Sequence, residues 1–225
     1  MTTLTTRRFL TRAALDSALE ERLGAALSAR GASAIMLSGG QTPMPAYDAL
    51  ARGTLEHDDR LHVLFTDERY VPADDVASNF HQSRALLTVL GLPDEGLLRV
   101  RTELPLPAAA ADYDTRLTAL LSSGVHIGLG LLGLGADGHT CSLFSAENLA
   151  AGRGRYAIAV KRPDGLSAVS VTPELLATVR EPVFVVAGRS KQAAVARLLA
   201  CDPTLTAWAA VQGCSAVELW VSEAD

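Results

Sequence analysis

Residues 126–139 read HIGLGLLGLGADGH, in which a mostly apolar run at 126–134 leads into a glycine-rich turn. A short apolar run that ends in glycine is typical of a strand buried on both faces, as strands of parallel sheets are. The turn carries Asp137 and His139 two residues apart. Because open α/β sheets bind ligands beyond the carboxyl ends of their strands, we expect chemistry in this turn.

Similar short apolar runs recur along the chain and alternate with longer segments of helical pattern. The other predicted strands are 34–37, 62–65, 156–160, 169–171, 183–187 and 217–221. The predicted helices are 17–30, 44–51, 79–87, 108–121, 190–199 and 203–210. This alternation predicts an α/β fold with a mostly parallel sheet and helices on both faces. No repeat or linker divides the chain, so residues 1–225 are expected to form a single domain. The segment before the first predicted strand has room for little more than one helix.

The bulk composition limits the kind of partner. The chain has 225 residues, 48% hydrophobic and 20% charged, with a net charge of −5. An acidic protein is a poor candidate for nucleic-acid or anionic-membrane binding, and any anionic ligand needs a local cationic pocket. No apolar run approaches about 18 residues, so neither a membrane span nor a signal peptide is expected. Three cysteines without a CxxC spacing favour a reducing, cytoplasmic location.

Two interpretations of the glycine turn compete. GLGLLG (128–133) and GLGADG (133–138) both fit the dinucleotide pattern G-x-G-x-x-G. The first lies inside the apolar run, and the second lacks the following long helix and the acid about 20 residues on. The alternative is a tight turn that displays His139 as a general base with Asp137 beside it. A plain surface turn stays open, and no partner cluster supports a metal site.

Two other segments after strands have features of anion sites. LSGGQTP (37–43) places Ser38, Gly39, Gly40 and Thr42 before a helix, where amides and the helix dipole favour an anion. It is not a Walker A loop, because no GK[ST] follows. AGRSK (187–191) places Lys191 in the first turn of a helix, against the dipole, and a bound phosphate would resolve that conflict. An ordinary corner and a solvated lysine are the simpler alternatives.

FTDERYVP (65–72) places Asp67, Glu68 and Arg69 in succession after a strand. The three charges form either a solvated turn or a site in which Arg69 meets an anion. Ser78 is a good cap for the next helix, and Asn79 could face the same pocket. No G-x-S-x-G sequence is present, which disfavours a serine hydrolase.

In order and spacing, LSGGQTP, FTDERYVP with Ser78-Asn79, GLGADGHTCSLF and VAGRSK resemble the 6-phosphogluconolactonase family, over about residues 8 to 221. That family hydrolyses 6-phospho-D-glucono-1,5-lactone to 6-phosphogluconate in the pentose phosphate pathway. The resemblance implies a Rossmann-like α/β fold, a sugar-phosphate substrate, and no metal or organic cofactor. We expect no nucleic-acid or membrane partner, and a monomer or weak dimer.

The resemblance also implies roles for individual residues. His139 would activate water, supported by Asp137, with Asp67 and Arg69 at the same catalytic site. The remaining predicted residues would bind substrate, with the phosphate at the 38–42 turn and Lys191: Ser38, Gly39, Gly40, Thr42, Glu68, Asn79, Gly138 and Lys191.

The chain departs from the family pattern at Ala168, where many members carry an arginine. If that arginine binds phosphate, then Lys161, Arg162 or Arg69 would have to replace it. Ser145 stands where a proline often follows SLF, which is a minor loop change.

Two rival functions remain open. Glucosamine-6-phosphate deaminases resemble the chain at the glycine turn but carry an acid five residues after the histidine, where this chain has Phe144. A sugar-phosphate-sensing domain of a transcription regulator is the other rival, although such proteins usually carry a helix-turn-helix.

Overall fold

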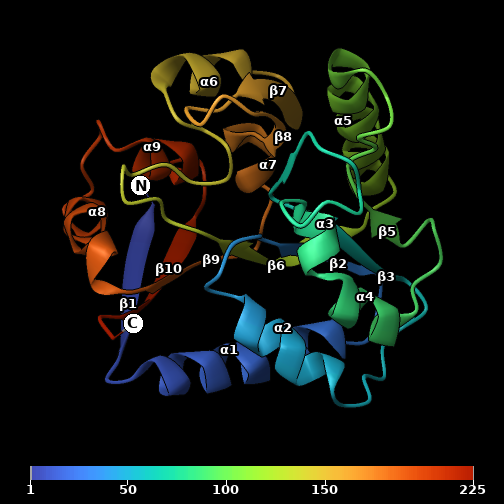
Figure 1. Ribbon diagram of the computed structural model, residues 1–225, viewed down its shortest axis with the longest axis horizontal. Coiled ribbons are helices and arrows are strands. Elements are labelled where there is room, and N and C mark those ends of the chain that lie inside the picture. Colours follow the sequence, from blue (N-terminus) through green and yellow to red (C-terminus); the bar gives the residue numbers. More distant parts are fainter. Residues whose placement is uncertain (1, 225) are drawn as a thin grey trace.

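The computed structural model describes residues 2–224 and contains a seven-stranded sheet whose neighbouring strands all pair in parallel (Figure 1). The order across this sheet is β1 (Thr3–Phe9), β10 (Ala216–Ser222), β9 (Glu181–Ala187), β6 (His126–Leu132), β2 (Ser33–Leu37), β3 (Leu61–Phe65) and β5 (Leu97–Leu98). The apolar run predicted as a strand at 126–134 contains β6, which is the middle strand of the sheet.

Helices cover both faces of the sheet. They are α1 (Arg12–Leu27), α2 (Met44–Ala51), α3 (Asn79–Gln82), α4 (Arg84–Leu90), α5 (Leu106–Ser122), α6 (Ala146–Ala151), α7 (Pro173–Leu176), the 3-10 helix η1 (Arg189–Lys191), α8 (Gln192–Leu199) and α9 (Thr206–Val211). Within β2, Ile35 and Leu37 pack with α1, α2 and α4, whereas Ala34 and Met36 pack with α5 and its neighbours. Because alternate residues of a strand point to opposite faces, a sheet covered on both faces needs continuous apolar strands. The predicted three-layer, mostly parallel α/β fold is confirmed.

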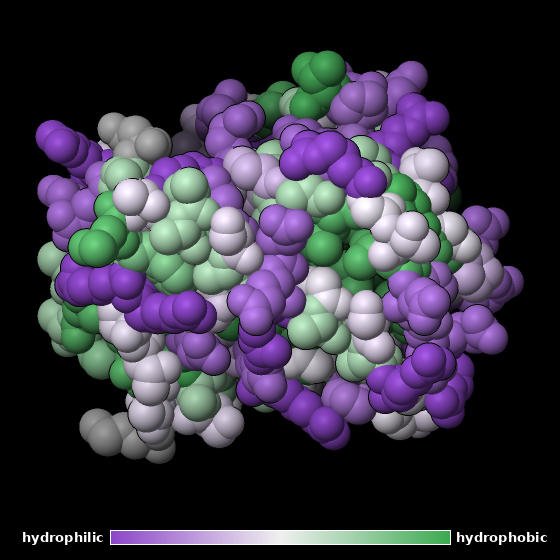
Figure 2. Space-filling view, turned by 90° about the horizontal axis from the view of Figure 1, so that it is seen from below, coloured by the Kyte–Doolittle hydropathy of each residue, from purple (hydrophilic) through white to green (hydrophobic). Residues whose placement is uncertain are grey.

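Helix α1 shows how the outer layer is built. Thr11 caps it by accepting a hydrogen bond from the amide of Ala14, and Leu15, Leu19, Leu23 and Leu27 form its buried stripe. Figure 2 views the molecule from the side of this helix and α2, and hydrophilic side chains run across the face between smaller apolar areas. None of the helices within residues 2–224 has the length and apolar character needed to cross a membrane.

A second sheet corrects one prediction. The runs at 156–160 and 169–171 do not join the parallel sheet; β7 (Ala157–Lys161) and β8 (Ser167–Val171) pair antiparallel, and β4 (Asp67–Arg69) adds to the other edge of β8. Only the residues 162–166 separate β7 from β8. Parallel neighbours need a crossover of a dozen or more residues, whereas a short turn suffices for a hairpin.

The chain start and one helix also differ from the sequence-based prediction. Residues 3–9 form the edge strand β1 before α1, and because most of its side chains are exposed it has no apolar signature. The predicted helix 79–87 is divided at Ser83 into α3 and α4. The predicted boundary at 190 is also shifted, because η1 precedes α8.

Strand order brings the predicted functional segments together. From β2 the chain continues to β3 on one side, and from β6 it continues to β9 on the other, although β2 and β6 are neighbours. A crevice forms where successive connections leave in opposite directions, at the carboxyl ends of the strands. Ser38, Thr66, Gly133 and Gly188, which each follow one of these four strands, all line one cavity.

Candidate active site

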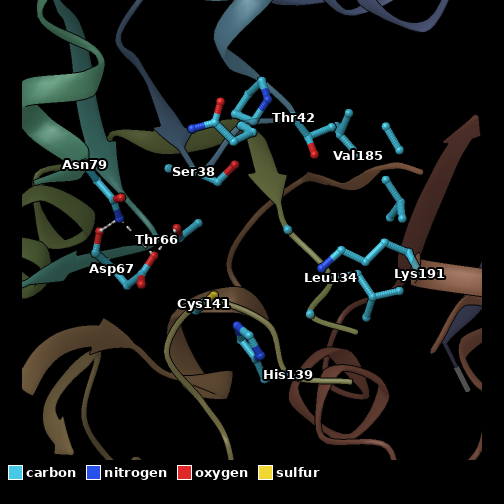
Figure 3. A pocket seen from close by; sticks show the side chains of 18 of the residues that line it. Ser38, Thr42, Thr66, Asp67, Asn79, Leu134, His139, Cys141, Val185 and Lys191 are labelled. Carbon is cyan, nitrogen blue, oxygen red and sulfur yellow. Dashed lines mark hydrogen bonds between the residues drawn. The ribbon is translucent and has the colours of Figure 1, made fainter. Parts of the chain in front are cut away.

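The cavity at the carboxyl ends of the central strands has a volume of about 550 Å³ (Figure 3). Its wall contains most of the predicted site residues: Ser38, Gly39, Gly40, Thr42, Asp67, Arg69, Asn79, His139 and Lys191. The structure therefore brings together residues as far apart in the chain as Ser38 and Lys191.

The glycine turn after β6 leaves space for the side chain of His139 beside the carboxylate of Asp137. A β-carbon on Gly135 would lie 2.1 Å from Nδ1 of His139 and 2.2 Å from Oδ1 of Asp137. Any other residue at position 135 would therefore occupy the space of this pair. The amide of Gly135 donates to the carbonyl oxygen of His139 and closes the turn.

The imidazole of His139 is oriented on two sides. Nδ1 lies 2.5 Å from Oδ1 of Asp137, and the ring packs 4.3 Å, centroid to centroid, from Phe144. Partial burial acts to raise the pKa of Asp137, but the hydrogen bond and charge of His139 outweigh it and hold that pKa below the ordinary value. An ionised Asp137 accepts a hydrogen bond from the Nδ1–H group of His139, which leaves Nε2 with a lone pair that can take a proton from water.

Asp67 lies in a buried network in the cavity wall. Its Oδ1 accepts a hydrogen bond from Thr66 Oγ1 at 2.9 Å, and its Oδ2 accepts one from Ser142 Oγ at 2.5 Å. The side chain of Asn79 donates to the backbone oxygen of Asp67 at 2.8 Å. A buried carboxylate needs such partners, so this arrangement fixes the carboxylate at the cavity surface.

Asn79 also explains one glycine of the 38–42 turn. A β-carbon on Gly39 would lie 1.8 Å from Oδ1 of Asn79, so the amide occupies the space that a side chain at 39 would fill. The amide of Gly40 donates to Oε1 of Gln82 at 3.3 Å, so this predicted phosphate donor already has a protein partner.

Glu68 corrects a prediction, because it does not line the cavity. It is 2% exposed, and its carboxylate accepts hydrogen bonds from the amides of Asn79 and Phe80 and from Ser78 Oγ. Burial raises the pKa of Glu68 above the ordinary value, although these hydrogen bonds act to lower it. Glu68 holds α3 and the backbone of Asn79 in place and is not positioned to bind substrate. Ser78 caps α3 as expected.

Asp137, which lies on the Nδ1 side of His139, is also outside the cavity wall, and so is Gly138. The φ of Gly138, +91°, suits glycine, but a side chain there would meet Leu205, and its carbonyl oxygen accepts from the amide of Ala207. It anchors the turn to α9, so we correct the expectation that it contacts substrate.

The cavity is cationic within an acidic protein. Asp67 is the one carboxylate among the lining residues. Four basic side chains line the cavity: Arg12, Arg69, Arg162 and Lys191. The charge distribution supplies the local positive pocket that an anionic ligand requires. In Figure 3 the side chain of Lys191 extends into the cavity above His139.

Arg12 is a lining residue that the sequence analysis missed. Its Nη2 donates to the carbonyl oxygen of Thr42 at 2.9 Å, and its Nε pairs with Asp16 at 2.7 Å. Like Lys191, Arg12 is a cation in the first turn of a helix, against the dipole, and that signal could have identified it. Other lining residues that were not predicted, including Gln41 and Cys141, have no such signal.

The alternatives to this site have little geometric support. GLGLLG (128–133) lies within β6 up to Leu132, and Gly128 and Gly130 face a neighbouring strand and Val179 in place of an open loop. Among residues 2–224, no group of three His, Cys, Asp or Glu side chains could hold a metal ion.

Comparisons with known proteins agree with one another. The family model of glucosamine-6-phosphate isomerases/6-phosphogluconolactonase matches residues 8–220. A Synechocystis 6-phosphogluconolactonase is 38% identical over 81% of this chain and 78% of its own length. The human 6-phosphogluconolactonase is 33% identical over 83% of this chain and 76% of its own length. The crystal structure of the Thermotoga maritima 6-phosphogluconolactonase superposes with a TM-score of 0.81, 25% identity and coverage of 99% and 100% of the two chains. The chain belongs to the glucosamine-6-phosphate isomerase/6-phosphogluconolactonase family.

Proposed function

We propose that this protein is a 6-phosphogluconolactonase, which hydrolyses 6-phospho-D-glucono-1,5-lactone to 6-phospho-D-gluconate in the oxidative branch of the pentose phosphate pathway. The relatives of similar length carry that name. The observation that carries the proposal is that His139, held by Asp137, lies in the wall of a cationic cavity. One base beside an anion-binding pocket suffices for a lactone, which is an activated ester.

The proposed reaction begins with a water molecule at Nε2 of His139. Nε2 takes a proton from the water while the oxygen forms a bond to the lactone carbonyl carbon, and the carbonyl oxygen becomes an oxyanion. The carbonyl group re-forms as the bond between its carbon and the ring oxygen breaks, and the ring oxygen takes the proton from the imidazolium of His139. The new carboxylic acid then loses its proton to solvent. Asp137 keeps the imidazole in one tautomer throughout and stabilises its charged form.

The proposed binding mode places the phosphate at the turn of residues 38–42. Arg12 is bonded to the carbonyl oxygen of Thr42 and so lies at this turn, and Lys191 extends into the cavity from the side of Val185. Cations fit a phosphate dianion, and hydroxyl donors on Ser38 and Thr42 complement them. Asp67, Asn79 and Arg69 then face the rest of the sugar.

Phe144 argues against the deaminase alternative. The position at which deaminases carry an acid holds an apolar ring, which packs against His139. A phenyl ring offers no proton to an amine leaving group. The segment before α1 is the strand β1, so the described residues 2–30 contain no helix-turn-helix of the kind that regulators carry.

We also propose that residues 1–225 act as one domain in the cytoplasm. The cavity takes residues from β2 and β3 in the first half of the chain and from β6 and β9 in the second half, which supports a single unit. Cys141, Cys201 and Cys214 are free thiols, which suits a reducing compartment.

A coupled assay with freshly generated lactone tests the function. Release of 6-phosphogluconate is followed above the rate of spontaneous hydrolysis, and His139→Ala should lower kcat by roughly 10²–10⁴-fold, the usual contribution of a general base. His126→Ala is the matched control, because His126 lies at the opposite end of the same strand. An His139→Ala activity within about threefold of the parent would exclude His139 as the base, and ammonia release from glucosamine 6-phosphate would favour the deaminase.

A further inference from the structure

The hairpin between β7 and β8 carries a cation in the cavity wall, Arg162. Ala168 is fully buried in β8, opposite Arg69 of β4 and Val160 of β7. Arg162 lies at the turn of the same hairpin, and its side chain is only 14% exposed. It lines the cavity, whereas its neighbour Lys161 is exposed and does not.

Three contacts hold the Arg162 guanidinium in the cavity wall. Nη2 and Nε bond to Asp164 at 2.9 and 3.0 Å, and Nη1 donates to Ser142 Oγ at 3.2 Å. The guanidinium carbon also lies 5.4 Å from the centre of the Phe144 ring. Since a guanidinium has five N–H donors and these bonds use three, two remain without a hydrogen-bond partner among the described residues.

These contacts place Arg162 beside the reacting groups. Ser142, which receives the Nη1 hydrogen bond, donates its own proton to Asp67 at 2.5 Å, so one hydroxyl separates Arg162 from Asp67. Phe144, which lies under the guanidinium, is also the ring that packs against His139. Figure 3 shows Asp67 and Asn79 on one side of the cavity and Thr42 and Lys191 on the other.

We propose that Arg162 binds the carboxyl end of the ligand, namely the lactone carbonyl of the substrate and the carboxylate of the product, and does not bind the phosphate. This inference rests on the proposed function. The phosphate end is served by Arg12 and Lys191, while Arg162 adjoins His139 and Asp67 through Phe144 and Ser142. A planar guanidinium with two free donors matches a carboxylate, and the same donors face the oxyanion that forms in the reaction.

Two product-like ligands that differ only in the carboxyl end test this assignment. 6-Phosphogluconate carries both phosphate and carboxylate, whereas sorbitol 6-phosphate carries the phosphate with a hydroxymethyl group in place of the carboxylate. Binding of each is measured by titration calorimetry to the parent protein and to Arg162→Gln, Lys191→Gln and Lys161→Gln. The last variant removes one charge from the same hairpin outside the cavity, and thermal melting checks that each variant is folded.

The expected result is a selective loss. Arg162→Gln should weaken 6-phosphogluconate roughly tenfold to hundredfold, as loss of a charge-assisted bond does, and sorbitol 6-phosphate by less than about threefold. Lys191→Gln should weaken both ligands by similar factors, and Lys161→Gln neither. Arg162→Lys, which keeps the charge but not the planar fork, should recover part of the affinity for 6-phosphogluconate.

Other outcomes would overturn the inference. Equal weakening of both ligands by Arg162→Gln would assign Arg162 to the phosphate, and no weakening of either would remove it from the binding site. If the parent protein binds neither ligand, the proposed function itself fails. That result differs from the two outcomes above, because both of them require a parent protein that binds the ligands.

Discussion

At the scale of single residues, the site depends on the absence of side chains as much as on their presence. Gly135 leaves the space in which Asp137 and His139 meet, and Gly39 leaves the space for the amide of Asn79. Neither glycine has a positive φ, so steric access and not backbone conformation is what requires glycine there. The sequence showed a glycine-rich turn but could not distinguish these two requirements.

Gly135→Ala should therefore disrupt catalysis without unfolding the protein. The new methyl group would displace the imidazole, and misplacement of a catalytic group by about 1 Å can cost roughly 10²-fold in kcat. Gly128→Ala in β6 is the matched control, because a β-carbon there would meet its nearest neighbour at 4.0 Å. The lactonase assay and thermal melting of both variants decide the matter: equal activity in the two variants would contradict the steric argument.

At the scale of elements, a buried carboxylate at the start of a helix helps to position the cavity wall. The carboxylate of Glu68, in β4, accepts from the first amides of α3 and so fixes Asn79 against Asp67. Sequence alone identified Asp67, Glu68 and Arg69 as a cluster of charges after a strand. It could not indicate that Glu68 alone of the three lies outside the cavity wall, because β4 pairs with β8, a strand far away in the sequence.

Glu68→Gln should change how stability depends on pH. The folded-state pKa of Glu68 is raised above 4.5 by burial, so the folded protein binds this proton more tightly than the unfolded chain does. The stability that the protonated Glu68 contributes is thus fully present below the pKa of this group in the unfolded chain. It is lost as pH rises through the pKa of Glu68 in the folded protein.

Urea unfolding of both proteins between about pH 4 and pH 7, around the ordinary glutamate pKa, measures this effect. The free energy of unfolding of the parent relative to Glu68→Gln should be highest at the acid end and fall as pH increases. A parallel pH dependence in the two proteins would show that Glu68 titrates normally.

At the scale of the whole molecule, a net charge of −5 coexists with a cavity lined by four cations and one carboxylate. The fold class and the location of the site at the strand ends followed from apolar runs and their order. The strands of the antiparallel hairpin were also found as apolar runs but were assigned to the parallel sheet, whereas the exposed edge strand β1 has no apolar signature. Arg12 and Arg162 belong to the site only through the long-range pairings that the fold creates.

The cationic cavity predicts that substrate capture depends on ionic strength. Because the Debye length shortens from about 30 Å at 0.01 M to about 8 Å at 0.15 M salt, added potassium chloride should raise KM several-fold with little change in kcat. Lys191→Gln should show a smaller increase over the same range. A KM that is independent of salt would mean that the cavity charges do not attract the phosphate.

The pairing of β1 with β10 has a consequence for biosynthesis. Thr3 lies opposite Ala216 and Phe9 opposite Ser222. Because β1 is synthesised before the other strands of this sheet and β10 after them, β1 has no neighbour until β10 has left the ribosome. Until β10 is synthesised, the edge of β9 that β10 will cover has unpaired backbone N–H and C=O groups. Such an edge can pair with a strand of another nascent chain. The polar, largely exposed side chains of β1 fit a strand that must stay hydrated during that delay.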